Sequence, residues 1–304
     1  MDRIECLLAF SHVLESGSFS AAAARLGTSQ PTISKRIAML EAEFGSRLFL
    51  RSTRNLTPTS EAQRIYEKAQ TVLEAYEDAR AIAGQKSPQI SGRLSISLPS
   101  SAGRNLLMPL FADYMQQFPL VDLDIRLSEK QVNLADEGVE LALRIGELAD
   151  SAMRARLLCR LPRFAVASPD YLLTHPAPQT PGELRDQICI GYAGFGELSQ
   201  WVFEGETGRH VVGIDPKIRI DDADAMLEMV LAGMGIAILP GWLASGPLKS
   251  GRLEKLLPDF TTPSMPVHIV HTQDRGPSQR GRKFIDHLYD NREKLTVLMS
   301  DGTL

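Results

Sequence analysis

A short run of polar and basic side chains near the N-terminus has the chemistry required to contact nucleic acid. Gln30, Thr32 and Ser34 carry amide and hydroxyl groups, which form hydrogen bonds with the edges of bases. Lys35 and Arg36 follow directly, and cations of this kind bind phosphates or purine edges. The run therefore predicts a surface that reads a duplex groove, provided that one element presents these side chains together.

A helix is the element that the surrounding residues predict. Apolar residues recur three or four positions apart through this run, at Ile33, Ile37, Leu40 and Phe44. They would form one buried face and leave the polar run on the other sides of the helix. Ser29 would cap the helix, Pro31 would lie in its first turn, where a missing N–H costs nothing, and Gly45 would end it.

A second, shorter helix is predicted immediately before the first. Ser20 would cap a helix over residues 21–26, and Gly27 would end it in the left-handed conformation. Its alanines make it narrow enough to pack closely against the next helix. Two helices separated by a sharp turn form a helix-turn-helix. The alternative is a small core of amphipathic helices whose cations are only a solvated face.

A basic hairpin follows the two helices. Leu48 and Leu50 alternate with polar or outward positions, and the turn Ser-Thr-Arg-Asn precedes Leu56, so we expect a β-wing with Arg51 and Arg54 at its tip. From residue 25 to residue 54 there are six cations against two acids, although the whole chain has a net charge of −4. Positive charge is gathered where a DNA-binding motif needs it. The candidate DNA-binding residues are Ser20, Ser29, Gln30, Pro31, Thr32, Ser34, Lys35, Arg36, Arg51 and Arg54.

The run GSFSAAAARLGTSQPTISKRIAMLEAEFGSRLFLRSTRNLTPT resembles the N-terminal signature of LysR-type transcriptional regulators. The resemblance implies a multidomain chain: an all-α winged helix-turn-helix DNA-binding domain, a long linker helix, and an α/β periplasmic-binding-protein-like effector domain of two lobes. It implies double-stranded promoter DNA and a small-molecule effector as partners, with RNA polymerase as a further candidate. Two later segments, LVDLDIRLSEKQVNLADEGVELALRIGEL and DDADAMLEMVLAGMGIAILPGWL, resemble one large subgroup of that family.

Composition is that of an ordinary globular protein. The chain has 304 residues, of which 43% are hydrophobic and 23% charged, enough for two or three domains with cores. There is no apolar run long enough for a membrane span and no signal-peptide pattern, so we expect a cytoplasmic protein without a membrane partner. The three cysteines have no C-x-x-C spacing, which argues against a disulfide framework or a metal site, and no cofactor is predicted.

A long helix is predicted from Ser60, with Gln63 three residues on, to Gly84. Small and apolar residues form a heptad seam along it, at Ala62, Ile65, Ala69, Val72, Tyr76, Ala79 and Ala83. The seam could be one face of a bundle within the chain. We favour pairing with a second copy, because no other helix is near in sequence and because the resembled family pairs its linker helices. The candidate dimerisation residues are Ile65, Ala69, Val72, Tyr76 and Ala79, in a homodimer or homotetramer.

Beyond Ile90 strands and helices alternate. Strand patterns over 94–98, 121–127 and LALRI, each separated by a helix, predict βα units and a mostly parallel sheet. A second set starts at FAVASP and includes ICIGY, a hairpin, a helix over 222–232 and IAILP; the last strand VHIVH and the final helix would return to the first lobe. The two-lobed layout comes from the resemblance. We expect a DNA-binding domain at 1–58, a linker helix at 59–88 and an effector domain at 89–304, with lobe I at 89–162 and 266–304 and lobe II at 163–265.

A ligand site is expected at the carboxyl end of the first strand of the effector domain. Pro99, Ser100 and Ser101 lie there, and hydroxyls with free N–H groups at a helix N-terminus would bind a carboxylate. The serines could equally be helix caps only. Facing candidates are Gly146, Tyr192 and Asp222, of which Tyr192 could be core and Asp222 a cap. The expected effector is therefore small and anionic.

Two other classes of protein compete with a regulator. A solute-binding protein would need export, and an α/β enzyme would need a catalytic or phosphate-binding motif. We find no G-x-S-x-G, G-x-G-x-x-G or Walker loop, and no metal-ligand cluster, so a non-enzymatic regulator is the leading interpretation.

Overall fold

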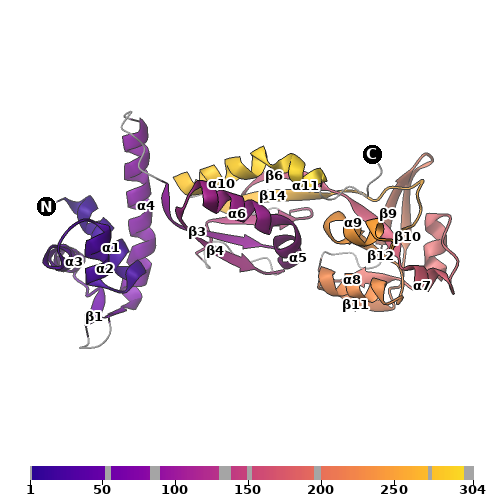
Figure 1. Ribbon diagram of the computed structural model, residues 1–304, viewed down its shortest axis with the longest axis horizontal. Coiled ribbons are helices and arrows are strands. Elements are labelled where there is room, and N and C mark those ends of the chain that lie inside the picture. Colours follow the sequence, from indigo (N-terminus) through magenta and orange to yellow (C-terminus); the bar gives the residue numbers. More distant parts are fainter. Residues whose placement is uncertain are drawn as a thin grey trace. The chain divides into compact units, whose positions relative to one another are not determined.

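The structure is a computed structural model. It describes residues 2–51, 56–82, 90–129, 138–148, 153–194, 200–272 and 276–297. Its elements fall into two compact units, Met1–Gln89 and Ile90–Leu304. Figure 1 labels the helices and most of the strands of the two units.

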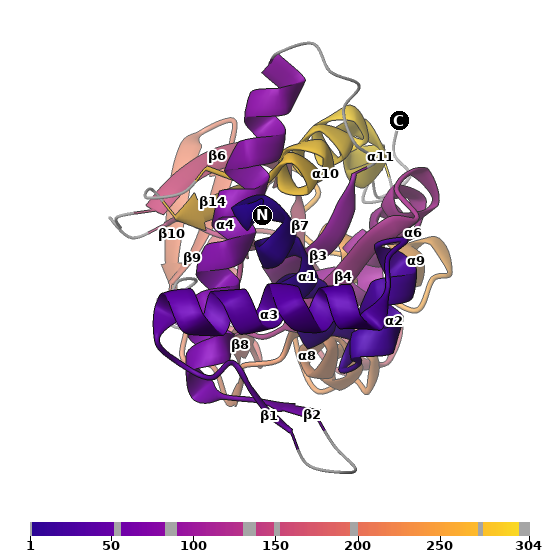
Figure 2. The same ribbon diagram turned by 90° about the vertical axis from the view of Figure 1, so that its left-hand side faces the viewer.

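The first unit is a winged bundle of helices. Its elements are α1 (Arg3–Ser16), α2 (Phe19–Arg25), α3 (Gln30–Phe44), β1 (Phe49–Arg51), β2 (Leu56–Pro58) and α4 (Ser60–Ile82). Figure 2 shows α3 running across the front of this unit, with the antiparallel β1–β2 hairpin below it. Phe10 lies at the centre of the core, with edge-on ring contacts to Phe49 and Tyr66.

The local signals in the helix-turn-helix match the structure with small shifts. Ser29 caps α3 and Gly45 ends it at φ 66°, as expected. The cap of α2 is Ser18 and not Ser20, which lies inside the helix. Phe44 was expected on the buried face but is 42% exposed, because the last turn of α3 extends beyond the core.

The wing begins one residue out of phase with the expected alternation. Leu48 and Phe49 are both buried, whereas Leu50 is 55% exposed. The reason is that Leu48 fills the core before the strand starts, so the strand pattern is set from Phe49 onward. The turn residues 52–55, with Arg54, lie outside the described residues, as does the side chain of Arg51.

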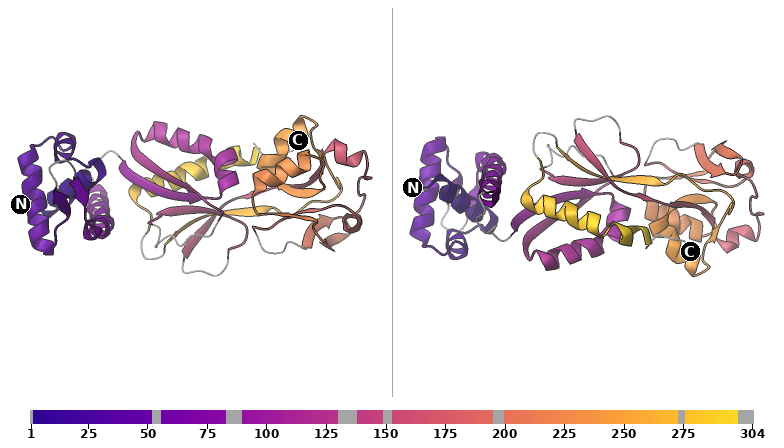
Figure 3. Two further views of the ribbon diagram at one scale, coloured as in Figure 1. Left: turned by 90° about the horizontal axis from the view of Figure 1, so that it is seen from below. Right: turned by 90° about the horizontal axis from the view of Figure 1, so that it is seen from above.

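The first lobe of the second unit is a five-stranded sheet in the order β4-β3-β5-β14-β6. Its strands are β3 (Ser91–Leu98), β4 (Leu120–Leu127), β5 (Leu141–Ile145), β6 (Met153–Leu161) and β14 (Met265–Thr272). Its helical elements are α5 (Ser100–Ala102), η1 (Gly103–Leu107), α6 (Met108–Gln117), α10 (Gln279–Asp290) and α11 (Arg292–Val297). Figure 3 shows α6 and α10 along the sheet, where Phe111, Tyr114 and Phe284 pack in the core.

The second lobe is built from smaller sheets. Its elements are β7 (Arg163–Ala167), α7 (Pro169–Leu172), η2 (Pro181–Asp186), β8 (Ile190–Tyr192), β9 (Gln200–Gly205), β10 (Gly208–Gly213), β11 (Ile218–Ile220), α8 (Ala223–Leu231), β12 (Ala237–Pro240), α9 (Gly241–Lys249) and β13 (Glu254–Lys255). The strand order is β12-β7-β13 in the three-stranded sheet, and β8 pairs with β11 in parallel. The chain thus leaves the first lobe after β6 and returns to it at β14, as expected.

The expectation of a mostly parallel sheet is wrong. In the first lobe β3 is parallel to β4 and β5, but β14 is antiparallel to both β5 and β6. In the second lobe β7 is antiparallel to both of its neighbours. The cause is the double crossing, because a strand that returns from the other lobe enters the sheet in the opposite direction. The helix expected between the second and third strands falls largely on residues 130–137, outside the described residues.

Candidate functional site

The N-terminal half of α3 presents a polar surface held in place by its own cap. The Ser29 side chain accepts a hydrogen bond from the Thr32 N–H, and the two hydroxyls lie 2.8 Å apart. Ser20 of α2 donates to Gln30 Oε1 at 3.2 Å, so the two helices meet at this point. Ile33, on the opposite face, is fully buried.

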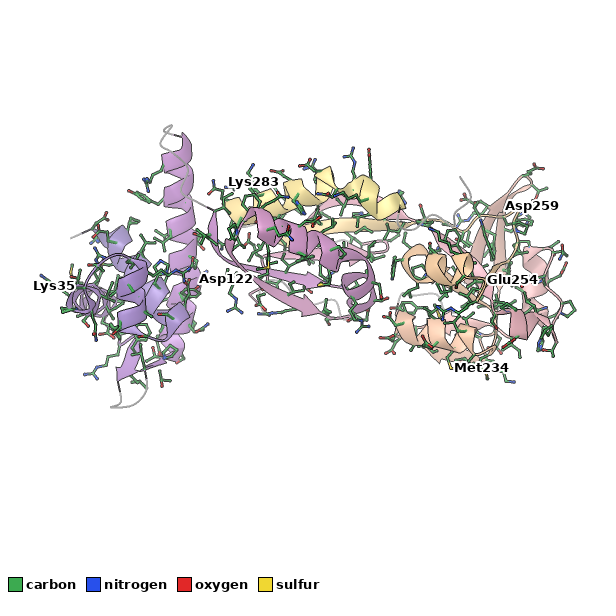
Figure 4. All side chains as sticks on the ribbon, viewed as in Figure 1. Lys35, Asp122, Met234, Glu254, Asp259 and Lys283 are labelled. Atoms are coloured by element: carbon green, nitrogen blue, oxygen red, sulfur yellow. The ribbon has the colours of Figure 1, made fainter. Side chains whose placement is uncertain are left out.

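Most of the α3 residues that were predicted to contact DNA are at least partly accessible to solvent. Gln30, Pro31 and Lys35 are exposed, and Thr32 and Ser34 are half-buried. Figure 4 shows Lys35 on the side of α3 that points away from α1 and α4. An exposed cation next to an amide and hydroxyls can contact both phosphates and base edges.

Arg36 does not belong to this surface. Its side chain is 14% exposed and forms an ion pair with Glu5 of α1. Because this guanidinium is committed to a partner in the same unit, we correct the prediction of a direct DNA contact. Arg36 instead ties α3 to α1.

Two residues that the sequence reasoning missed hold the wing. The carboxylate of Glu41 in α3 accepts hydrogen bonds from the N–H groups of Leu48 and Phe49, at 2.8 and 3.3 Å. Thr59 Oγ1 donates to Arg47 O at 2.9 Å and accepts from Ala62 N at 3.1 Å. In the sequence, Glu41 was only an acid that reduced the local positive charge, yet its hydrogen bonds fix the start of the hairpin relative to α3.

The predicted seam on α4 is divided between two environments. Ala62 and Ala69 are buried against the core of their own unit, and Ile65 is half-buried. Val72 and Tyr76 are 48% and 41% exposed. Ala79 is exposed as well. The first half of the helix therefore serves its own unit, and the second half carries apolar side chains that its own unit leaves uncovered.

An open groove of about 590 Å³ runs beside this helix. Its apolar wall is formed by Leu7, Leu40, Phe44, Ile65 and Val72. Arginine, lysine and glutamate side chains complete its lining. Phe44, exposed on α3, is thus continuous with the exposed part of α4.

Glu15 connects α1 with α4 and α2. Its carboxylate accepts hydrogen bonds from Tyr66 Oη at 2.9 Å and Gln70 Nε2 at 3.4 Å, and Arg25 lies 3.4 Å away. Burial raises the pKa of this carboxyl, but hydrogen bonds from His12 and Tyr66 and the nearby charges outweigh burial and leave the pKa below its ordinary value of 4.5.

This lowered pKa predicts acid sensitivity of the first unit. A carboxyl with a depressed folded pKa stabilises the fold above its unfolded pKa, and that contribution is lost as the pH falls through the folded value. Below pH 4.5, the unfolding temperature of the first unit should decrease as the pH falls. We expect this decrease to be less steep in Glu15→Gln than in the wild type. Equal slopes in calorimetric scans between neutral and acidic pH would contradict this role.

A cavity of about 130 Å³ lies between the two lobes of the second unit. Of the predicted ligand residues, Pro99, Ser101 and Tyr192 line it. Ser100, Gly146 and Asp222 do not. Asp222 caps α8 by accepting from Ala225 N at 2.8 Å, and Gly146 N donates to Pro266 O at 2.9 Å. Residues that the sequence reasoning missed also line the cavity: Ala102, Glu129, Ile145, Arg163, Ile190, Gln200, Trp201, Ala223, Met226, Ile238, Pro240, Trp242 and Met265.

The helix N-terminus at Ser100 already holds an anion, which corrects the expected carboxylate site. Glu129 Oε1 accepts from the N–H groups of Ser100 and Ser101, at 2.8 and 3.4 Å. Its other oxygen accepts from Tyr192 Oη at 3.4 Å. Burial and then the Glu129 charge raise the pKa of the Tyr192 phenol well above its ordinary value, so Tyr192 stays a donor. A second carboxylate at this helix end would meet a negative charge.

Polar contacts cross the cavity mouth from lobe to lobe. Trp242 Nε1 donates to Ser101 Oγ at 3.2 Å. Asp224 of α8 accepts from Arg104 and from Asn105 Nδ2, at 2.8 and 2.7 Å. Burial raises the pKa of Asp224, but the hydrogen bonds from Arg104, Asn105 and Ser101 lower it by more than burial raises it. The pKa is therefore below its ordinary value. These contacts hold the lobes together around the cavity.

Arg163 lies where the chain crosses between the lobes. Its Nε donates to Pro263 O at 3.0 Å, and its own carbonyl accepts from Thr262 Oγ1 at 2.6 Å, which joins the two crossing segments. Within the described part of the chain no carboxylate forms an ion pair with this guanidinium. Burial is the sole cause that lowers its pKa. Among the residues that the structure describes, the Arg163 cation in the cavity therefore has no counter-ion.

The remaining chemistry in the described residues is sparse. They include no group of three or more histidine, cysteine or acidic side chains placed to hold a metal ion. Their cysteines are free, and burial raises the pKa of Cys159 to about 11 and of Cys189 to about 12, so little thiolate forms at neutral pH. Among the same residues, no helix combines the length and apolar character needed to cross a bilayer.

Comparison with known proteins agrees with this arrangement. Two family models match: "LysR substrate binding domain" over residues 87–292, and "Bacterial regulatory helix-turn-helix protein, lysR family" over residues 4–63. The HTH-type transcriptional regulator CrgA of Neisseria meningitidis serogroup B is 33% identical over 289 residues, which are 94% of this chain and 96% of CrgA. PtxR of Pseudomonas aeruginosa is 30% identical over 297 residues, 97% of this chain and 95% of PtxR.

A solved structure extends the similarity to the fold. The structure of CrgA, a LysR-type transcriptional regulator from Neisseria meningitidis, matches with a TM-score of 0.61 at 31% sequence identity. The match covers 95% of this chain and 98% of that one. Both the winged helices and the two-lobed unit therefore have counterparts in one solved protein.

Proposed function

This chain belongs to the LysR family of transcriptional regulators, and from that premise we propose how its own residues carry out regulation. Gln30, Thr32 and Ser34 read base edges in a major groove, and Lys35 binds phosphate. The observation that carries this proposal is the Ser29-capped end of α3, which is polar and exposed on one face and buried at Ile33 on the other. We propose promoter DNA next to the chain's own gene as the first target, and RNA polymerase as a further partner.

The effector half of the proposal concerns the cavity between the lobes. Ligand binding there would change how tightly Ser101 with Trp242, and Arg104 with Asp224, hold the lobes together. A ligand can shift such an equilibrium only through its different affinities for the two arrangements. We propose that the cavity binds its ligand without converting it, and that the protein acts in the cytoplasm.

Assembly is the third part of the proposal. We propose that a second copy covers the exposed half of α4, with Val72 and Tyr76 in the contact. Support comes from the apolar groove beside the helix, whose charged lining of both signs suits an identical partner. Two recognition helices in one assembly would bind two half-sites.

The proposed function is tested by fluorescence anisotropy with DNA that flanks the gene and with unrelated DNA of the same length. The flanking DNA should bind more tightly, and its affinity should fall steeply with salt, because phosphate contacts release counter-ions. Equal affinity for both DNAs at every salt concentration would contradict a sequence-reading role.

Two substitutions separate phosphate contacts from base contacts. Lys35→Ala should weaken binding to both DNAs and reduce the slope of log K against log salt by about 0.9 for each subunit that contacts the DNA. Gln30→Ala should reduce the difference in binding free energy between flanking and unrelated DNA. The reduction should be about 1–3 kcal/mol, the value of one base contact. Lys283→Ala is the matched control, since Lys283 is an exposed cation of the second unit and should leave both quantities unchanged. Wild-type behaviour of both test variants would remove α3 as the recognition helix.

A further inference from the structure

The charges in the cavity restrict which ligand it can bind. Glu129 supplies a negative charge on one wall, where it already satisfies the N–H groups of Ser100 and Ser101. Arg163 supplies a positive charge, and no ion pair joins these two residues. A half-buried guanidinium that forms no ion pair with a described carboxylate is costly, and a bound anion would offset that cost.

Arg163 can bind a ligand in the cavity in addition to its structural hydrogen bond. Its Nε is used by the Pro263 carbonyl, and it lines the cavity. A guanidinium has five N–H donors in a planar fork, so donors remain after that hydrogen bond, and the fork matches a carboxylate in two parallel bonds. An anionic group of a ligand therefore has its natural partner here and not at the Ser100 helix end.

Apart from Ser101 and Gln200, the rest of the wall is apolar or aromatic. Trp201 and Trp242 line the cavity together with aliphatic side chains from both lobes. Trp201 lies near the start of β9, and Trp242 lies in the first turn of α9. Tyr192 is not free to donate to a ligand, because its hydroxyl hydrogen is directed to Glu129. Glu129 is thus the charged acceptor that the lining offers to a donor on the ligand.

From this juxtaposition we propose that the ligand is a small monocarboxylate with an apolar body and a separate hydrogen-bond donor. Arg163 binds the carboxylate, the tryptophans cover the body, and Glu129 accepts a hydrogen bond from a hydroxyl or ammonium group. The inference rests on the proposed effector role of the cavity. It assigns the ligand's chemical class and its orientation.

The test uses two sets of three probes. In each set one probe has both a carboxylate and a hydroxyl group, and each of the other two lacks one of these groups. The first set is 4-hydroxybenzoate, benzoate and phenol, and the second is 5-hydroxypentanoate, pentanoate and 1-pentanol. Calorimetric titration of the full chain should give the tightest binding for the hydroxy acid in at least one set. Loss of the carboxylate, or of the hydroxyl, should weaken binding about tenfold or more, as expected for a charge-assisted hydrogen bond.

Variants assign each preference to its residue. Arg163→Gln should bind the hydroxy acid no better than the wild type binds the matching alcohol or phenol, and Arg163→Lys should recover part of the preference because it keeps the charge. Glu129→Gln should bind the hydroxy acid and the simple acid about equally. Arg219→Gln is the matched control, an exposed arginine of the second lobe that does not line the cavity. Thermal unfolding of every variant checks that it is folded.

The outcomes separate this inference from the proposed function. Binding of phenol or pentanol as tightly as the hydroxy acid, unchanged selectivity in Arg163→Gln, or no binding of any probe at millimolar concentration would overturn the assigned chemistry. Anisotropy with flanking DNA is run on the wild-type chain in parallel. If that DNA binding is present while the probe selectivity is absent, only the ligand class fails; if sequence preference is absent too, the regulatory role fails.

Discussion

Val72→Glu is expected to separate the proposed dimer into single chains. Val72 is 48% exposed on α4 of its own unit, so a glutamate costs little in a single chain. In a helix pair it would place a charge in a desolvated contact, at a cost of about 3–5 kcal/mol. The dissociation constant of the dimer should rise roughly a hundred- to several-thousandfold.

Sedimentation velocity measures this change directly. Met115→Glu is the matched control, because Met115 is a similarly exposed apolar residue on α6 of the second unit. The control should keep the wild-type assembly. DNA with one half-site should still bind Val72→Glu, whereas the advantage of two half-sites should be lost. An unchanged sedimentation coefficient for Val72→Glu would show that α4 serves only its own unit.

The second large effect is expected in the core of the winged unit. Phe10 is fully buried, and its ring contacts Phe49 of the wing and Tyr66 of α4. Phe10→Ala removes the residue that these two elements share. Such a truncation should destabilise the unit by about 3–5 kcal/mol.

A reciprocal substitution in the second unit makes this prediction selective. Phe284 is also fully buried, between Phe111 and Tyr114 of the first lobe. The two cores share no residues, so each substitution should affect the unfolding of one unit. Phe10→Ala should lower only the unfolding temperature of the winged unit, and Phe284→Ala only that of the second unit. A common shift of both transitions in either variant would mean that the units unfold together.

Local features of the fold could be predicted from the sequence because they depend on near neighbours. Ser29, Pro31 and Gly45 act within one turn of α3, and the spacing of Ile33 and Ile37 fixes the buried face. The same holds for α8, where Asp222 was expected either as a ligand contact or as a cap, and it is the cap.

The errors involve residues whose partners are far away in the chain. Arg36 resembles a DNA contact in sequence, and only the fold brings Glu5 to it. Glu129 reaches the helix end at Ser100 because β3 and β4 are adjacent parallel strands. No local pattern encodes either pairing.

Strand β6, where Cys159 lies in a strand-like run, was not assigned to the sheet for a different reason. Its residues alternate poorly between apolar and polar, because it is the edge strand and much of it is exposed. Its partner β14 lies more than a hundred residues later, so the direction of the pair could not be predicted. The cavity residue Arg163 lies two positions after this strand. Its partners Thr262 and Pro263 are also about a hundred residues later, so the sequence did not indicate a role for it.

The length of α4 has a consequence for the DNA that the protein can recognise. Its 23 residues span about 34 Å at a rise of about 1.5 Å per residue, similar to one turn of the duplex. In the proposed dimer, a slip of one heptad along the partner helix would displace the two reading heads by about 10 Å, or about three base pairs. In that proposed dimer, the positions of Val72 and Tyr76 along α4 would set the distance between the two half-sites of the operator.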